Sequence, residues 1–308
     1  MIDVSVRRPV APADAAIVQR LADAAAGAAG HPVVGDSVRR DLAAPTPGSA
    51  VVVAAIDGDA VGALHVAPPE NDDDDPIAMA VAVDPGHLDE GIERALVDAA
   101  LHDPALRGRS LLLWVFGADS STDRFAAAAG FTLDRELHQM RVPLPLPAAV
   151  DAAWPAGVEV RPFRPGIDEA AWLTVNNRSF VDDPDQRGWT LETLRRREAE
   201  PWFDPAGFLL AWLGDALTGF CWTKVHPPAP PREPEALGEI YVIGVDPDHK
   251  RLGLGRALVV DGLASLHEHG ATCGMLFVDA ANAKAVTLYD ELGFTISRTD
   301  RAYARDVP

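Results

Sequence analysis

The sequence predicts an α/β protein made of two similar domains in tandem, and three observations support this. First, Val83-Asp84-Pro85, Gly91 and Arg94-Ala95-Leu96-Val97 recur 162 residues later as Val245-Asp246-Pro247, Gly253 and Arg256-Ala257-Leu258-Val259. Eight identities at one constant shift favour a duplicated domain over chance similarity. Second, strand and helix patterns alternate along the second half. Third, the proline-rich stretch Pro143-Leu144-Pro145-Leu146-Pro147 cannot continue a helix and suits a linker between domains. We therefore expect domains at 1–142 and 158–308, with a linker at 143–157.

The second half carries predicted elements in the order strand, helix, helix, strand, strand, strand, helix, strand, helix, strand. Thr190 fits an N-cap, Gly214-Asp215 a hairpin turn and Gly293 a helix C-cap position. The expected ranges are 158–163, 169–180, 191–200, 208–213, 217–226, 239–245, 255–269, 275–278, 283–292 and from 294 onward.

Composition and charge exclude several classes of protein. The chain is 48% hydrophobic and 24% charged, which is close to the globular average and argues against disorder. Lys and Arg number 27 against 46 Asp and Glu, and a net charge of −19 would repel a phosphate backbone, so we expect no nucleic-acid partner.

The location of the protein is predicted from its apolar runs and its cysteines. No run reaches the ~18 to 20 apolar residues that cross a bilayer, and Asp3, Arg7 and Arg8 interrupt the N-terminal residues. Cys221 and Cys273 are too few for a disulfide framework or a zinc site. We expect a soluble, cytoplasmic monomer without a membrane partner. No metal is expected either, because the acidic run at 72–75 lacks the glycine and the spaced Glu of a calcium loop.

One strand-to-helix loop, residues 245–256, has the composition of a phosphate site. Gly253 and Gly255 let the backbone approach a ligand, and the unpaired N–H groups of the following helix turn point at it. Lys250, Arg251 and Arg256 add positive charge in an acidic protein.

Other interpretations of this loop fit less well. A Walker loop needs Gly-Lys-Ser or Gly-Lys-Thr, but Gly255 is followed by Arg256. A dinucleotide fingerprint needs a third glycine, where this chain has Leu258. Taken alone, two glycines are equally typical of a plain strand-to-helix connection.

The context of the loop resembles the GNAT acetyltransferase superfamily. The matching residues are Lys250-x-x-Gly253-x-Gly255, Asn282-x-x-Ala285-x-x-x-Tyr289 and Leu292-Gly293-Phe294; Lys250 stands where Gln or Arg is usual. The resemblance implies two tandem GNAT folds, each a mixed, mostly antiparallel sheet flanked by helices. It also implies that the loop amides bind the acetyl-CoA pyrophosphate, and that strand 243–245 splays from its neighbour to pair with the pantetheine arm. The implied acetyl-CoA contacts are Ile243, Gly244, Val245, Lys250, Arg251, Leu252, Gly253, Leu254, Gly255, Arg256, Asn282, Ala283, Lys284, Ala285, Val286 and Thr287.

Further segments resemble the mycothiol synthase (mycothiol acetyltransferase) family of tandem GNAT enzymes. They are 176–180, 184–190, 200–205, Trp222-Thr223-Lys224-Val225-His226 and 238–242, and with the duplication they cover essentially the whole chain. The resemblance implies acetyl transfer from acetyl-CoA to the cysteinyl amine of Cys-GlcN-Ins, giving mycothiol and CoA.

This reaction needs a base and an acid. An α-amino group with a pKa of about 8 is mostly protonated at neutral pH, so a base must remove a proton. Glu239, just before the cofactor strand, fits that base directly or through a water, and Tyr289 fits the acid that protonates the CoA thiolate. Backbone N–H groups around Val245 would stabilise the oxyanion. Without the resemblance, Glu239 would be an exposed strand-end carboxylate and Tyr289 a core aromatic. Neither cysteine lies in a motif, so both are expected to be packing residues rather than nucleophiles.

The resemblance assigns the acceptor to Asp36, Asp185, Lys224 and Glu239. Carboxylates that accept from several hydroxyls suit a polyol, whereas Asp36 and Asp185 alone would be ordinary loop acids. Phe277 departs from the family, which usually has a substrate-contacting tyrosine there. Losing that hydroxyl would cost one hydrogen bond, about 0.5 to 1.5 kcal/mol of acceptor affinity.

The first copy departs further from the pattern. Its loop reads His87-Leu88-Asp89-Glu90-Gly91-Ile92-Glu93, with three carboxylates where a pyrophosphate would lie. Residues 124–131 offer no Asn or Tyr equivalent. We expect a catalytically silent N-terminal domain that lends Asp36 to the cleft. The resemblance would permit a second CoA site at Val81, Ala82 and Val83, but the loop charges argue against it.

Two other functions remain open at this stage. One is N-acetylation of another small amine or a peptide N-terminus by the same domain. The other is a non-catalytic CoA-binding regulatory module, which would bind CoA without turnover.

Overall fold

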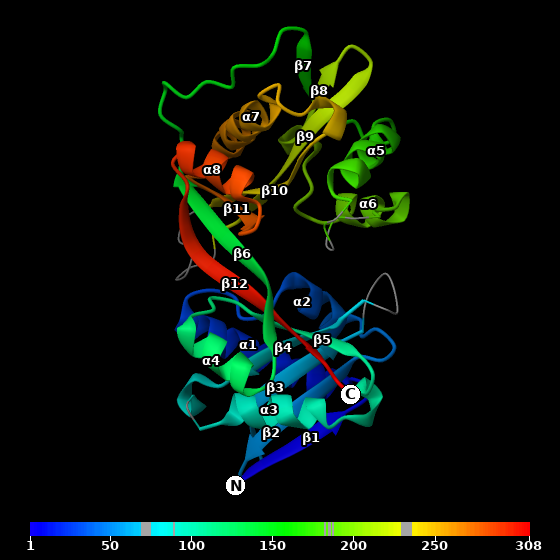
Figure 1. The fold of residues 1–308 in the computed structure, drawn as a ribbon, viewed down its shortest axis with the longest axis vertical. Coiled ribbons are helices and arrows are strands. Elements are labelled where there is room, and N and C mark those ends of the chain that lie inside the picture. Colours follow the sequence, from blue (N-terminus) through cyan, green and yellow to red (C-terminus); the bar gives the residue numbers. More distant parts are fainter. Residues whose placement is uncertain (69–74, 89, 182, 184–185, 187, 229–235) are drawn as a thin grey trace. The chain divides into compact units, whose positions relative to one another are not determined.

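The computed structural model describes residues 1–68, 75–88, 90–181, 183, 186, 188–228 and 236–308. It divides into two compact units (Figure 1). Unit 1 comprises Met1–His138, Asp279–Ala281 and Arg298–Pro308, and unit 2 comprises Gln139–Val278 and Asn282–Ser297.

Unit 1 is an α/β layer structure whose elements follow the order strand, helix, helix, three strands, helix, strand, helix, strand. The bounds are β1 (Ile2–Arg7), α1 (Pro12–Ala29), α2 (Asp36–Ala43), β2 (Ala50–Ile56), β3 (Asp59–Ala67), β4 (Ile77–Val83), η1 (Pro85–His87), α3 (Ile92–Leu101), η2 (Pro104–Leu106), β5 (Ser110–Val115), α4 (Ser120–Ala128) and β6 (Thr132–Pro143), of which unit 1 holds the residues up to His138.

The sheet of unit 1 is mixed. Strands β1 to β4 pair antiparallel in sequence order, and β4 pairs parallel to β5, with α3 as the crossover between them. Alternate strand residues face two apolar cores: Val52 packs with α3 and α4, and Val51 with α1 and α2.

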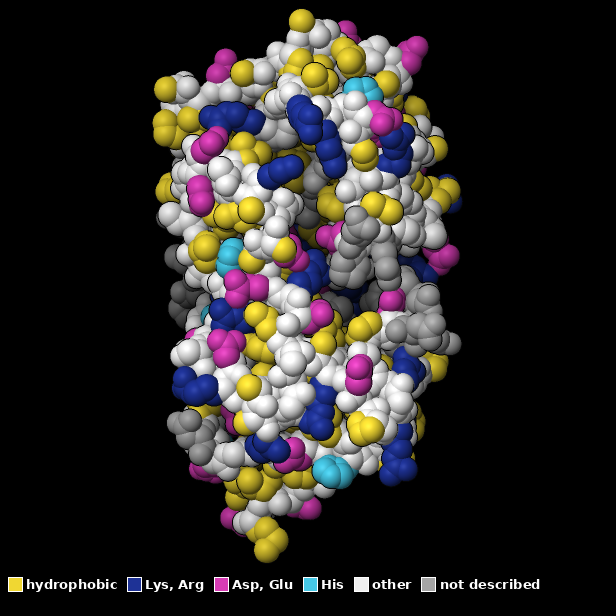
Figure 2. Space-filling view, viewed as in Figure 1, with side chains coloured by type: hydrophobic (Ala, Val, Ile, Leu, Met, Phe, Trp, Pro, Cys, Tyr) yellow, Lys and Arg dark blue, Asp and Glu magenta, His cyan; other side chains and the backbone are white. Residues whose placement is uncertain are grey.

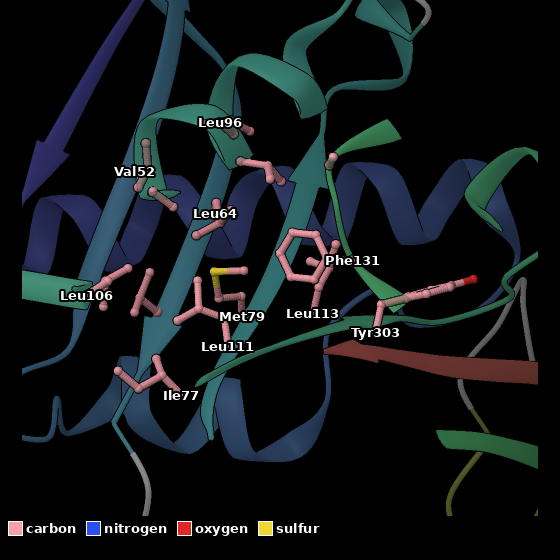
Figure 3. Close-up of a cluster of buried hydrophobic side chains, with 14 of the residues drawn as sticks. Val52, Leu64, Ile77, Met79, Leu96, Leu106, Leu111, Leu113, Phe131 and Tyr303 are labelled. Carbon is pink, nitrogen blue, oxygen red and sulfur yellow. The ribbon is translucent and has the colours of Figure 1, made fainter. Parts of the chain in front are cut away.

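The last strand of the chain completes unit 1. Strand β12 (Thr295–Asp306) pairs antiparallel with β5 from Arg301–Val115 to Asp306–Ser110. Figure 3 shows Tyr303 of β12 in the core beside Phe131, and its hydroxyl donates to Asp123 Oδ1 at 2.7 Å. Residues 298–308 therefore belong to unit 1, and not to the second unit as the sequence boundaries place them.

Unit 2 repeats the same order of elements. The bounds are β7 (Val158–Pro162), α5 (Glu169–Ser179), α6 (Leu191–Glu198), η3 (Pro205–Gly207), β8 (Phe208–Leu213), β9 (Ala216–His226), β10 (Leu237–Val245), η4 (Pro247–His249), α7 (Leu254–Glu268), β11 (Cys273–Asp279) and α8 (Ala283–Glu291), followed by β12. The predicted order of the second half is confirmed, and every range agrees within two residues. Thr190 is confirmed as an N-cap, accepting from the Thr193 N–H at 3.1 Å.

Local chemistry explains where these elements turn and end. Gly214, with φ +58°, lies in the tight turn that joins β8 to β9. Gly293, with φ +89°, follows α8, and the Phe294 N–H bonds back to the Tyr289 carbonyl at 3.0 Å. In the sheet β7 to β10 pair antiparallel, while β10 and β11 are parallel, joined by α7.

The proline-rich segment belongs to unit 2 and packs against its core. The Leu144 N–H donates to the Thr272 carbonyl at 2.9 Å, and Trp154 Nε1 donates to Asp261 Oδ2 at 2.8 Å. Ala152 is buried in the same core as α7 and α8.

Among the described residues, none of the helices combines the length and the apolar composition that crossing a membrane requires.

Candidate functional site

Strand β10 separates from β11 in unit 2. The two strands pair from Leu237–Cys273 to Ile240–Leu276, but β10 continues to Val245 and β11 to Asp279. On its other edge β10 stays paired with β9 as far as Val245–Gly219. The segment after Ile240 thus extends beyond the last pair with β11, and its backbone can pair with an extended ligand in the manner of an added strand.

A β-bulge lies at the start of this segment. The β9–β10 register shifts between Ile240 and Val242, so Tyr241 is the extra residue. Ile240 packs with α7, whereas Tyr241 and the next residue, Val242, both pack into the aromatic cluster under α5 and α6. The bulge changes which side chains face each side of the sheet.

The loop after β10 has a defined turn. Asp246 caps η4 by accepting from the Asp248 N–H at 2.9 Å. Arg251 has φ +73° and Gly253, the N-cap of α7, has φ +81°. Because Gly253 has no side chain to cap the helix, the first N–H groups of α7 remain available to an anion.

Helix α5 holds this turn in place. Arg178 Nη2 lies 2.6 Å from Asp248 Oδ2, its Nε lies 3.4 Å from Asp246 Oδ2, and Ser179 Oγ donates to the Val245 carbonyl at 3.1 Å. Hydrogen bonding to Arg178 lowers the pKa of the Asp248 carboxyl. Arg178 and Ser179 lie in the segment 176–180 that resembles the family, but the sequence alone indicates no role for them.

The basic side chains of the loop lie on the surface. Lys250 and Arg251 are exposed, and Arg256 Nη1 is 3.9 Å from Glu291 Oε2, where both side chains are exposed to solvent. Figure 2 shows Lys and Arg side chains interspersed with Asp and Glu on the face that it draws. Positive charge therefore adjoins the start of α7 within a surface of mixed sign.

Helix α8 combines an exposed start with a buried tyrosine. The Asn282 side chain caps it by accepting from the Ala285 N–H at 3.2 Å, and Ala283 and Lys284 are exposed. Tyr289 is 6% exposed, and burial raises the pKa of its phenol. The phenol therefore stays protonated at neutral pH, as an ordinary tyrosine does.

Glu239 and Lys224 lie directly opposite each other on β10 and β9. Glu239 is buried rather than exposed at the strand end, and its Oε2 lies 2.6 Å from Nε2 of His226. The Lys224 ammonium lies over Trp202, 4.8 Å from the ring centroid, and 5.7 Å from that of Tyr241. The contact between His226 and Glu239 was not predicted from the sequence, although Lys224 and His226, two residues apart on one strand, share a face of the sheet.

The remaining predicted acceptor residues lie in different parts of the chain. Phe277, on β11, is the first residue after its last pair with β10 and is 40% exposed. Asp36 is the first residue of α2 in unit 1. Asp185 lies outside the described residues. Their contacts with an acceptor remain predictions.

The cysteines differ in burial. Cys221 is fully buried, and a Cβ added at Gly262 of α7 would lie 2.5 Å from its Sγ. Burial raises the pKa of the Cys221 thiol, which disfavours the nucleophilic thiolate. Cys273 is half-buried at the start of β11.

The first copy has the same backbone arrangement. Strands β4 and β5 pair from Ile77–Leu111 to Ala80–Trp114, so Val81, Ala82 and Val83 extend beyond that pairing. Gly91, with φ +78°, is the N-cap of α3. The side chains differ, because His87 Nδ1 lies 3.2 Å from Glu90 Oε2 and Glu93 lies in the first turn of α3.

Comparisons with known proteins agree with this geometry. The Acetyltransferase (GNAT) family profile matches residues 171–294, which span the separated strand and the loop after it. The mycothiol acetyltransferase of Thermobispora bispora is 43% identical over 96% of this chain and 97% of its own length. The chain belongs to the mycothiol acetyltransferase family. The relative with the same name from Geodermatophilus obscurus is also 43% identical, covering 96% of this chain and 95% of its own.

Solved structures support the tandem GNAT fold. A GCN5-related N-acetyltransferase from Sphaerobacter thermophilus matches 99% of this chain and 96% of its own, with a TM-score of 0.73 and 24% identity. A tandem GNAT protein from the clavulanic acid biosynthesis pathway matches 99% of both chains, with a TM-score of 0.69 and 19% identity. At these identities the likeness concerns the fold alone, and it confirms the predicted fold class.

Proposed function

We propose that this chain transfers the acetyl group of acetyl-CoA to the cysteinyl α-amine of Cys-GlcN-Ins, forming mycothiol and CoA. The observation that carries the proposal is the edge of β10 beyond its last pair with β11, leading into the uncapped first turn of α7. The name of the relatives that match over nearly their whole length supports the substrate.

The residues present fit acetyl-CoA. The pantetheine arm contains amides, which can pair with the backbone of residues 242–245 as another strand would. The first N–H groups of α7, with Lys250, Arg251 and Arg256 nearby, suit the pyrophosphate. The exposed start of α8 adds further contacts, at Asn282, Ala283, Lys284, Ala285, Val286 and Thr287. Acetyl-CoA, when bound, supplies an acyl carbon activated by its thioester.

Three groups of the chain serve the chemical step. Glu239 accepts a proton from the ammonium, directly or through a water, so that the amine lone pair can attack the acyl carbon. Backbone N–H groups near Val245 stabilise the oxyanion. As the new C–N bond forms and the C–S bond breaks, Tyr289 donates its proton to the leaving thiolate.

The acceptor is proposed to bind through Lys224, Asp36 and Asp185, whose polar groups suit a hydroxyl-rich sugar and inositol. Phe277 offers this acceptor a ring without a hydroxyl. A cytoplasmic location and a monomeric state remain predictions from the sequence.

A comparison of acceptor substrates tests the function. Purified protein is incubated with acetyl-CoA and with Cys-GlcN-Ins, polyamines or peptide amines in parallel, and CoA release is measured. We expect Cys-GlcN-Ins to be the preferred substrate, with a product that still carries a titratable thiol because acetylation is on nitrogen. Turnover only with other amines would support a different N-acetyltransferase, and CoA binding without any turnover would support a regulatory module.

A further inference from the structure

His226 and Glu239 form a close pair on adjacent strands of unit 2. Nε2 of His226 lies 2.6 Å from Oε2 of Glu239, and their side chains are 31% and 11% exposed. In the β9–β10 register His226 is opposite Leu237, so it is the diagonal neighbour of Glu239. One carboxylate oxygen thus contacts the imidazole, while the other, Oε1, remains for a substrate proton.

Among the described residues, few charged groups lie near this pair. Lys224 lies on the same strand as His226, two residues earlier, and opposite Glu239. The segment that packs over Lys224 through Trp202 carries Asp204, whose Oδ2 lies 3.3 Å from Nε2 of His269. On the next strand Cys273 pairs with Leu237, one strand away from His226. Within the described residues, Glu239 is the polar partner of His226.

Basicity explains why a carboxylate would benefit from this partner. An α-ammonium has an ordinary pKa of about 8, and a glutamic acid about 4.3, so proton transfer to an isolated glutamate is uphill by almost four pKa units. The ordinary imidazole pKa, about 6.5, is much closer to that of the amine. A carboxylate that passes the proton to an imidazole therefore matches the amine better than a carboxylate alone.

We propose that His226 is the positioning residue of Glu239, which fixes the carboxylate through Oε2 and receives the substrate proton from it. This inference rests on the proposed function. An N–H bond of the ammonium breaks as an O–H bond forms on Glu239. The carboxyl group then turns so that its O–H faces His226. In the tautomer with hydrogen on Nδ1, Nε2 has a free lone pair and accepts this proton, which restores the carboxylate and gives an imidazolium whose Nε2–H donates back to Glu239. Because the His226 side chain is partly exposed, water can take the proton and reset the pair.

The simpler alternative is a contact that only joins two strands. A strand contact and a proton partner differ in their effect on the pH profile, because loss of a strand contact lowers activity equally at every pH. If the proton partner is lost, the enzyme acetylates mainly the fraction of the amine that is already neutral, so the loss of activity is larger at low pH than at high pH.

The test compares His226→Gln and His226→Ala with His267→Gln, a matched histidine change on α7 whose Nδ1 lies 3.2 Å from the Ala271 carbonyl. We expect His226→Gln to lower kcat/KM for the acceptor on the order of 10- to 100-fold at neutral pH, with KM for acetyl-CoA unchanged. The ascending limb of its pH profile should move towards the ordinary amine pKa of about 8. His267→Gln should match the parent in rate and profile.

Chemical rescue separates the two roles further. Added imidazole should restore part of the activity of His226→Ala without affecting the parent. A parent-like rate in His226→Gln, or a uniform loss at all pH values without rescue, would overturn the inference. Failure of the parent to acetylate Cys-GlcN-Ins would instead overturn the proposed function, so the two failures are distinguishable. Thermal unfolding of each variant identifies any loss that comes from misfolding.

Discussion

The two strand-to-helix loops share a backbone and differ in chemistry. Asp84 and Asp246 each cap a short 3-10 turn, and Gly91 and Gly253 have φ values of +78° and +81° at the start of α3 and α7. After the turn, however, one loop reads Leu88-Asp89-Glu90 and the other Lys250-Arg251-Leu252. The same backbone turn is therefore combined with opposite charge.

The position of the proposed base also differs between the two copies. The pair Gly62–Val83 in the first copy is equivalent to the pair Gly219–Val245 in the second. Followed along the strands from these pairs, Lys224–Glu239 in the second copy corresponds to Ala67–Ala78 in the first. Between these pairs β10 contains one residue more than β4. The reason is that β10 has the bulge at Tyr241, whereas the β3–β4 register is continuous over the equivalent stretch. With alanine at both positions, the first copy has neither the carboxylate nor the ammonium here.

The position of the proposed acid, Tyr289, likewise carries a different residue in the first copy. The Phe294 N–H bonds to the Tyr289 carbonyl at 3.0 Å, and the Phe131 N–H bonds to the Ala126 carbonyl at 2.9 Å. Ala126 is thus the counterpart of Tyr289. The comparison teaches that the two copies keep one backbone arrangement while the side chains proposed for catalysis, and the bulge, are found in the second copy alone at these positions.

The largest expected effect comes from removing the carboxylate that β10 has at Glu239 and that β4 lacks at Ala78. Glu239→Gln should lower kcat by about 10²- to 10⁴-fold, because it removes the proton acceptor, while acetyl-CoA affinity stays unchanged. Steady-state rates and calorimetric titration with CoA measure the two quantities. The conservative Ala78→Gly change in the first copy serves as a control with parent-like rates. Parent-like turnover by Glu239→Gln would rule out the assigned base.

Tyr289→Phe should have a similar or smaller effect on kcat, because only the proton donor is lost. Burial raises the pKa of Tyr289 above the ordinary value of about 10, so the protonated form persists to higher pH than for a free tyrosine. In the parent, ionisation of this phenol should therefore cause no loss of kcat below about pH 10. An alkaline limb below pH 9 that disappears in Tyr289→Phe would contradict this assignment.

Exchange of the loop charges should have an intermediate effect. Replacing Lys250-Arg251-Leu252 by Leu-Asp-Glu should raise KM for acetyl-CoA about 10-fold or more at low salt, at roughly 1 kcal/mol for each exposed charge. Because the effect is electrostatic, it should shrink as ionic strength rises. The reverse exchange at 88–90 is the matched control and should leave turnover unchanged. Equal KM values for parent and exchange variant would show that these charges do not contact the cofactor.

The smallest effect is expected from the two N-cap glycines. An added Cβ meets open space at both Gly91 and Gly253, so alanine there costs only backbone strain, about 1 kcal/mol of unfolding free energy in each unit. Denaturant unfolding measures this cost. We expect Gly253→Ala, but not Gly91→Ala, to raise KM for acetyl-CoA a few-fold. Identical kinetic changes in both variants would place a cofactor at the first copy as well.

Much of the fold could be predicted because its signals are local. Helical and strand periodicity, Thr190 as an N-cap and Gly293 after α8 each depend on a few neighbouring residues. The duplication required only a comparison of the chain with itself. The glycines and charges of the loop at 245–256 likewise predict a phosphate site, and the structure adds the left-handed turn at Arg251 and Gly253.

The rest depends on residues that are distant in the chain. The sequence by itself determined the tandem α/β organisation, the order of elements and the opposite charges of the two loops, because composition and spacing are written along the chain. Only the tertiary structure decided that β12 pairs with β5, that Tyr241 forms a bulge, and that His226 contacts Glu239. These three features depend on strand register, which long-range packing sets, and a shift of one residue in register would turn each side chain to the other face.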